Sequence, residues 1–196
     1  MVGDKTISAV MFVRNEEFYI KEAISGVLNQ SIFVDEIIII DDSSIDLTKN
    51  IVEKEKKDNI NIKLLTNKKR GKAYSCELGL QNVKTDLFFI CSGDDVLSKQ
   101  YVEKMYEYIS VEGIKYAYSN YLITDEDLVT NRFISKGKYY NKYQLLCDCY
   151  TGGYLFGYTE IISHLLPFPN GLTFEDWYIA IVLSQRFGGN HVNNKP

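Results

Sequence analysis

Two pairs of adjacent aspartates suggest chemistry most directly. Asp41-Asp42 and Asp94-Asp95 each follow a run of apolar residues. Carboxylates that converge on one crevice repel one another unless a cation or hydrogen-bond donors compensate them. Mg²⁺ and Mn²⁺ suit such oxygen ligands, and typically take one or two protein carboxylates together with water and substrate phosphate. The pairs therefore indicate a shared Mn²⁺ or Mg²⁺ site, although an isolated pair would more simply cap a helix.

A basic loop offers cationic contacts for phosphate. Gly71 and Lys72 are the better candidates, because glycine lets the backbone approach a ligand closely beside a helix N-terminus. Lys68 and Lys69 are expected to be solvated.

A third acidic group occurs late in the chain, in Glu175-Asp176-Trp177, at the start of an expected helix. A carboxylate at this position can cap the helix or act as a general base, and local sequence does not separate the two.

The elements that must position these residues follow from hydrophobic periodicity. Apolar runs predict buried strands at 7–13 and 36–40 and a short strand at 87–91, and 61–65 is expected to be a further strand. Helical spacing predicts helices over about 16–30, 45–57, 72–83 and 98–110, the first capped by Asn15. This alternation predicts an α/β fold, a Rossmann-like, mostly parallel sheet with helices on both faces. Ligands bind such sheets at the carboxyl ends of the strands, where both aspartate pairs lie.

The alternation ends after residue 113. Residues 115–123 and 131–139 are tyrosine-rich and predict a small antiparallel addition, whereas 141–149 and 174–186 have helical character. No linker or repeat separates the halves, so 1–196 is expected to be a single domain.

Composition excludes several classes of protein. The 196 residues carry a formal net charge of -4, so the chain has no overall field to attract nucleic acid. No apolar run approaches about 20 residues and the first residues contain no signal-peptide core. The four cysteines match no zinc signature and are expected to be free thiols. We therefore expect a cytoplasmic protein; peripheral association with the inner face of a membrane is left open.

Together, these motifs resemble the family 2 glycosyltransferases, which have the GT-A fold. The match rests on five segments in order: 8–17 (SAVMFVRNEE), 23–31 (AISGVLNQS), 36–44 (EIIIIDDSS) with Asp46, 92–95 (SGDD) and 175–177 (EDW). The resemblance implies inverting transfer of a sugar from a nucleotide-diphosphate sugar, a UDP- or dTDP-sugar, to a glycan, lipid-linked or other hydroxyl acceptor. Synthesis of surface polysaccharide or glycoconjugate is the implied setting.

The resemblance also implies roles for individual residues. Residues 1–112 would form the nucleotide-sugar-binding half and 113–196 the acceptor-side half. Asp176 would be the catalytic base, and Asp94 and Asp95 would hold the metal–diphosphate, with Asp94 also near the ribose. The nucleotide would contact Phe12, Arg14, Glu16, Asp41 and Asp42, with Gly71 and Lys72 near its phosphates.

Three features depart from the family pattern. Cys76-Glu77 occupies the place of a common Arg-Asn pair, which puts an arginine–diphosphate contact in doubt. Ser92 replaces the first acid of the usual metal motif. The final segment, 191–196, resembles the approach to the family's last core strand, so we expect a chain truncated at its C-terminus; the role of His191 is left open.

Two alternatives remain at this stage. A sugar-nucleotide pyrophosphorylase-like nucleotidyltransferase would share the core and the metal site, but the turn after the first strand has no glycine. A non-catalytic nucleotide- or glycan-binding domain would not need the intact acids at Asp94, Asp95 and Asp176. The glycine patterns of Rossmann dehydrogenases and P-loop enzymes are absent.

Overall fold

A computed structural model describes residues 4–125, 129–134, 139–140, 143, 154–188 and 190–193. For 130–134, 139–140 and 190–193 only the backbone is considered. The expected helix at 141–149, Cys147, Cys149 and the His191 side chain lie outside the described residues.

The first half alternates strand and helix as predicted. Its elements are β1 (Ile7–Val13), α1 (Ile20–Leu28), β2 (Glu36–Asp41), α2 (Thr48–Asp58), β3 (Ile62–Thr66), α3 (Lys72–Asn82), β4 (Leu87–Ser92) and α4 (Tyr101–Glu112). The second half contains shorter strands. Its elements are β5 (Tyr116–Ser119), β6 (Tyr121–Thr124), β7 (Thr130–Ile134), β8 (Tyr139–Tyr140), β9 (Leu155–Tyr158), the 3-10 helix η1 (Thr159–His164), α6 (Glu175–Phe187) and β10 (Asn190–Asn193).

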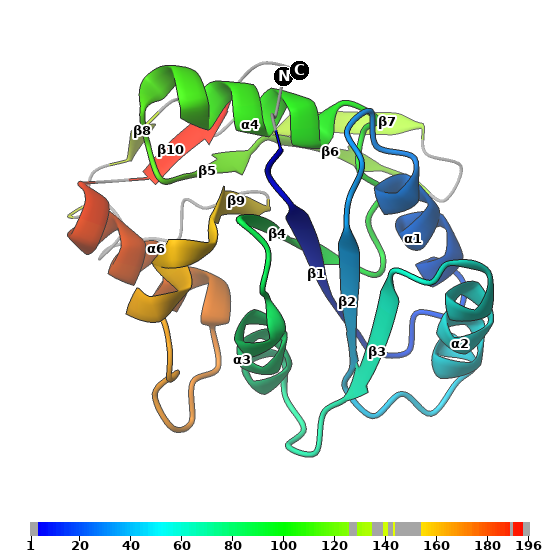
Figure 1. Cartoon of the computed structure of the whole chain (residues 1–196). Helices are drawn as coiled ribbons and strands as arrows, with labels where there is room; N and C mark the ends of the chain where they lie inside the picture. The colour runs from blue at the N-terminus through cyan, green and yellow to red at the C-terminus, as the bar shows by residue number, and fades with distance from the viewer. Residues whose placement is uncertain are drawn as a thin grey trace.

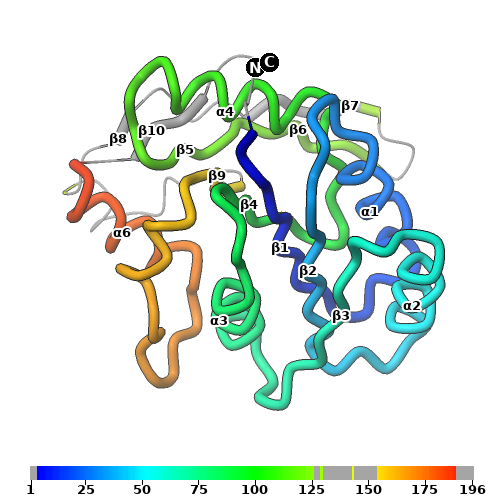
Figure 2. Tube along the Cα trace, in the orientation of Figure 1, coloured from blue at the N-terminus to red at the C-terminus, as the bar shows by residue number. Residues whose placement is uncertain are grey.

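The main sheet has the strand order β3-β2-β1-β4-β9-β5-β10-β8. Its pairs from β3 to β4 are parallel, whereas β9 runs antiparallel to both of its neighbours, β4 and β5. β6 and β7 form a separate antiparallel pair. The expected mostly parallel α/β sheet with a small antiparallel addition is confirmed, and Figure 2 traces the path of the chain through it.

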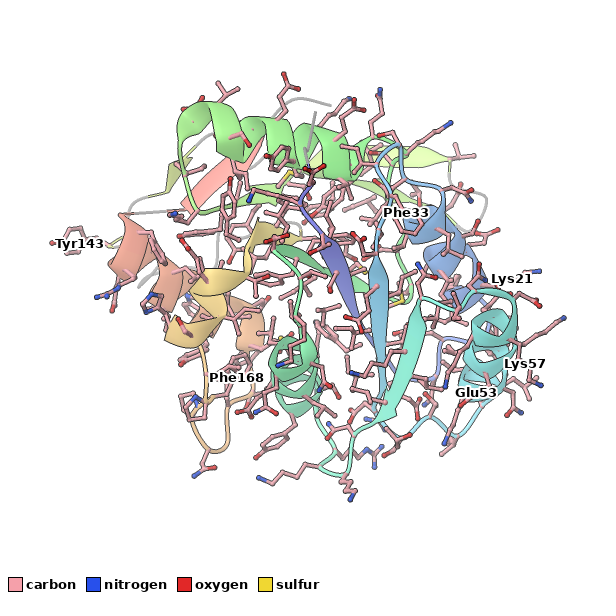
Figure 3. All side chains as sticks on the ribbon, viewed as in Figure 1. Lys21, Phe33, Glu53, Lys57, Tyr143 and Phe168 are labelled. Atoms are coloured by element: carbon pink, nitrogen blue, oxygen red, sulfur yellow. The ribbon has the colours of Figure 1, made fainter. Side chains whose placement is uncertain are left out.

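Helices cover both faces of this sheet, with α3 and α6 on one side and α1 and α4 on the other (Figure 1). Alternate residues of β1 divide between two cores: Ala9 and Met11 face the α1/α4 side, whereas Val10 and Phe12 face α3 and α6. A strand buried on both faces is apolar throughout, which explains the uninterrupted run that predicted it. Figure 3 shows the outer side chains of α1 and α2, such as Lys21 and Lys57, directed into solvent.

One predicted cap is wrong. Asn15 does not cap α1, which begins only at Ile20 after a turn. Asn15 instead adopts a left-handed backbone with φ of 55°, and its Oδ1 accepts a hydrogen bond from the Ile45 amide at 2.9 Å. Its side chain therefore joins two loops rather than starting a helix.

Cys76 and Cys91 are buried free thiols, as expected. None of the helices in the described part of the chain is long and apolar enough to cross a bilayer.

Candidate active site

Both aspartates at the end of β2 are buried and held by amide donors. The Gly71 N–H donates to Asp42 Oδ1 at 2.9 Å and to Oδ2 at 3.1 Å. Asn67 Nδ2 lies 3.3 Å from Asp42 Oδ1, and Asp41 Oδ1 accepts from the Ser44 N–H at 3.3 Å. The carboxylate of Asp42 is thereby tied to the loop that leads from β3 into α3.

The second pair, at the end of β4, is exposed instead. The Ser92 hydroxyl donates to Asp94, and the Tyr154 hydroxyl donates to Asp95. Burial, together with the negative charge of Asp95, raises the pKa of Tyr154, so this hydroxyl stays protonated as a donor. Tyr154 immediately precedes β9, so the second half of the chain contributes a residue to this corner at the end of β4.

Glu16 lies beside this second pair. Burial, reinforced by the charge of Asp94, raises the pKa of Glu16 from 4.5 to about 7. Its Oε2 is buried without a hydrogen-bond partner, and a Cβ at Gly93 would collide with it. This corner therefore concentrates negative charge. The Ser92 and Tyr154 hydroxyls donate to Asp94 and Asp95, and Glu16 Oε2 is left without a donor.

The expectation that both aspartate pairs surround one cation is not met. Among the residues that the structure describes, no three or more acidic, histidine or cysteine side chains are grouped to hold a metal. Asp42 instead accepts hydrogen bonds from the Gly71 amide and from Asn67. A metal at Asp94 and Asp95 would thus complete its coordination with phosphate and water, the usual arrangement for Mg²⁺.

Lys72 connects the first half of the chain to α6. Its Nζ lies 5.5 Å from the centroid of the Phe12 ring and 3.2 Å from Glu175 Oε1. Glu175 is buried, whereas Asp176, the next residue, is exposed and accepts from the Trp177 N–H at 2.8 Å. Arg14 is exposed at the end of β1.

The strand register brings these groups to one edge of the sheet. Asp41 pairs with Val13 across β1 and β2, and Ser92 pairs with Phe12 across β1 and β4. The ends of β2 and β4 therefore flank that of β1, and Lys72 joins this edge to the start of α6. Sequence reasoning missed Asn67 as the side chain that holds Asp42; its one available signal was a polar residue directly after a strand.

This topology is that of the GT-A α/β fold, which solved structures share. Staphylococcus aureus TarS in complex with UDP superposes with a TM-score of 0.71 at 18% identity, covering 95% of this chain and 56% of that one. The Pyrobaculum calidifontis mannosyltransferase PcManGT, in complex with GDP-Man and Mn²⁺, gives a TM-score of 0.72 at 14% identity, covering 98% and 55%.

Sequence comparison identifies the family. The model for glycosyl transferase family 2 matches residues 8–163, and the chain belongs to this family. An uncharacterized glycosyltransferase of Haemophilus influenzae is 31% identical over 124 residues, 61% of this chain and 48% of its own length. The Escherichia coli UDP-Glc:alpha-D-GlcNAc-diphosphoundecaprenol beta-1,3-glucosyltransferase is 29% identical over 183 residues, 91% of this chain and 69% of its own length. The chain thus spans about half of the Haemophilus relative.

Proposed function

We propose that this protein transfers a sugar from a nucleotide-diphosphate sugar, a UDP- or dTDP-sugar, to an acceptor hydroxyl with inversion at the anomeric carbon, in glycan or polysaccharide synthesis. The observation that carries the proposal is the single sheet edge that holds Asp42, Asp94 and, through Lys72, the helix start with Asp176. Family membership supports transfer over the nucleotidyltransferase alternative.

Asp94 and Asp95 would hold Mn²⁺ or Mg²⁺. The fit rests on the uncompensated charge of this corner, because Glu16 keeps a buried oxygen without a partner and a pKa raised to about 7 beside Asp94. A bound divalent cation would neutralise the diphosphate and make it a better leaving group. A manganese ion accompanies GDP-Man in the PcManGT structure.

The nucleotide would lie along the ends of β1 and β2. Phe12, Arg14 and Glu16 would lie near the base and ribose, and Asp42, together with Asp41, would contact the base. Gly71 and Lys72 would lie on the phosphate side, where a cation stabilises the charge that develops as the leaving group departs.

Asp176 would act as the general base. It takes the proton of the acceptor hydroxyl while the hydroxyl oxygen forms a bond to the anomeric carbon. The bond from that carbon to the diphosphate breaks on the opposite face, and the diphosphate leaves with the electron pair. Attack from the opposite face inverts the configuration. The exposure of Asp176 leaves it accessible to an acceptor.

For the acceptor, we propose a hydroxyl of a lipid-linked or other glycan, bound by the half from residue 113 onwards. The name of the Escherichia coli relative specifies a diphosphoundecaprenol-linked acceptor. Peripheral association with a membrane would bring the protein to such an acceptor.

The substitution Asp176→Asn tests the assignment. It keeps the size of the side chain but removes the base, so transfer should fall about 100- to 10,000-fold while affinity for UDP with Mn²⁺ stays within about twofold. Transfer can be followed with UDP-glucose, Mn²⁺ and a GlcNAc-diphospholipid, and UDP affinity by calorimetry. Loss of UDP binding in Asp176→Asn would contradict the base role.

The wild type serves as the control for the class of function. Binding of UDP and manganese without transfer or donor hydrolysis, across UDP- and dTDP-sugars, would favour the non-catalytic binding domain.

A further inference from the structure

Glu175 is a buried carboxylate at the first residue of α6. It is 4% exposed, and its side chain forms an ion pair with Lys72, whose own side chain is 63% exposed. Within the described residues, Glu175 forms this one ion pair. A buried carboxylate without a cation is costly, so the Lys72 ammonium must stay near the helix start.

Cys76 of α3 lies close to Glu175. The thiol of Cys76 is fully buried one turn after Lys72 on α3, and its pKa is raised by burial and by the charge of Glu175. A thiol offers Glu175 no compensating charge. The ion pair with Lys72 and the burial of Glu175 therefore set the position of its carboxylate.

A continuous series of contacts leads from the donor side to the proposed base. Asp42 binds the Gly71 amide, Lys72 follows Gly71 in the chain, and Lys72 pairs with Glu175, which precedes Asp176. Adjacent residues in a first helical turn share one rigid backbone segment. Whatever holds the Glu175 side chain therefore also fixes the backbone from which the Asp176 side chain projects.

We propose that Glu175 is a positioning residue: through its ion pair with Lys72 it orients Asp176 toward the donor and couples nucleotide binding to the start of α6. The inference rests on the proposed transfer reaction with Asp176 as base. A shift of about 1 Å in a positioned group can cost on the order of 100-fold in rate, so the ion pair is expected to affect turnover more than binding.

Other contacts keep α6 folded without this pair. The Phe168 N–H donates to Glu77 Oε1 at 3.1 Å, and the Phe168 ring packs on Tyr178 with centroids 5.2 Å apart. The Tyr178 hydroxyl donates to the Leu165 carbonyl at 3.1 Å. Figure 3 shows Phe168 beside α3. Removal of the charge on Glu175 should therefore loosen the first turn without unfolding the helix.

The test compares Glu175→Gln with the wild type in kinetics and in fluorescence. Trp177 is the single tryptophan of the chain and lies in the first turn of α6, so its emission reports on that turn. Addition of UDP with Mn²⁺ should change Trp177 emission in the wild type. In Glu175→Gln that change should be lost, and kcat should fall about 10- to 100-fold, while the donor KM and the calorimetric Kd for UDP stay within about twofold.

Two further variants complete the design. Lys72→Arg preserves the ion pair and should retain the Trp177 response. Glu160→Gln removes the exposed Lys115–Glu160 pair, whose atoms lie 2.8 Å apart, and should leave kcat unchanged. The positioning role is overturned if Glu175→Gln keeps both kcat and the Trp177 response, or loses UDP affinity as much as kcat. A wild type that binds UDP but transfers nothing refutes the proposed function, and the fluorescence comparison still decides the coupling.

Discussion

The surroundings of Glu16 disfavour the charged form of its carboxyl. Its carboxyl is partly buried, one oxygen has no partner, and the neighbouring charges of Asp94 and Asp95 act in the same direction as burial. In contrast, Asp42 is buried more deeply but accepts hydrogen bonds from Gly71 and Asn67. Hydrogen-bond donors compensate the charge of Asp42 but not that of Glu16, which supports the proposed cation site at the end of β4.

The pKa of Glu16 predicts how stability depends on pH. Because the folded state raises this pKa from 4.5 to about 7, folding favours the protonated acid. Its unfavourable contribution is absent below pH 4.5, grows as pH rises from 4.5 to about 7 and is complete above that. Metal-free Glu16→Gln should therefore lose less stability between pH 5 and 8 than the wild type.

After allowance for solvent screening the difference should be about 1–2 kcal/mol, or roughly 2–8 °C in Tm. Thermal denaturation of both proteins at the two pH values measures it, and Mn²⁺ at pH 8 should stabilise the wild type. Parallel pH profiles for Glu16→Gln and the wild type would refute the raised pKa.

At the scale of elements, α3 matters because it presents Gly71 and Lys72. Gly79 lets this helix lie directly on the sheet: a Cβ there would lie 2.8 Å from Ile40 Cδ1 and would also collide with Val10. Close packing of α3 on β1 and β2 fixes the loop before it, and hence the Gly71 amide that binds Asp42.

Gly79→Ala is therefore expected to destabilise the protein. Alanine gains about 1 kcal/mol in helix propensity, but overpacking typically costs about 1–3 kcal/mol and here affects two strands. We expect a net loss of about 1 kcal/mol in urea denaturation and weaker UDP binding. Asn50→Ala, at an exposed position of α2, is the matched control and should be neutral or slightly stabilising. A more stable Gly79→Ala would show that α3 can shift outward freely.

Sequence reasoning recovered the elements whose signal is local. The run 36–40 is apolar because both faces of β2 are covered, so its place and its acidic end were predictable. Asn15 was misassigned because its partner, the Ile45 amide, comes from a distant loop. The contacts of Asp42 with Gly71 and of Lys72 with Glu175 also join segments that are distant in the sequence. Each depends on where α3 packs on the sheet, which hydrophobic periodicity does not encode.

At the scale of the molecule, β9 joins the two halves. It runs between β4 and β5, with Phe89 opposite Phe156 and Phe88 opposite Gly157. The rings of Phe89 and Phe156 stack with centroids 6.3 Å apart, and Tyr101 of α4 packs edge-on against both. Strand pairing and core are thus continuous across the boundary near residue 113, and this supports the proposal of a single domain.

A single domain should unfold in one cooperative transition. Trp177 fluorescence reports on α6, in the second half, and far-ultraviolet circular dichroism is dominated by the four helices of the first half and α6. We expect the two thermal curves to coincide.

Phe156→Ala removes a fully buried ring from the contact between β4 and β9. It should lower stability by about 3–5 kcal/mol in both curves equally, because the cavity opens in a core that both halves share. If the fluorescence transition of Phe156→Ala moved to lower temperature while the dichroism transition stayed in place, the halves would be separate folding units. Asp176 would then reach the donor edge by docking of one unit on another, and the ion pair of Lys72 and Glu175 would become an interface contact.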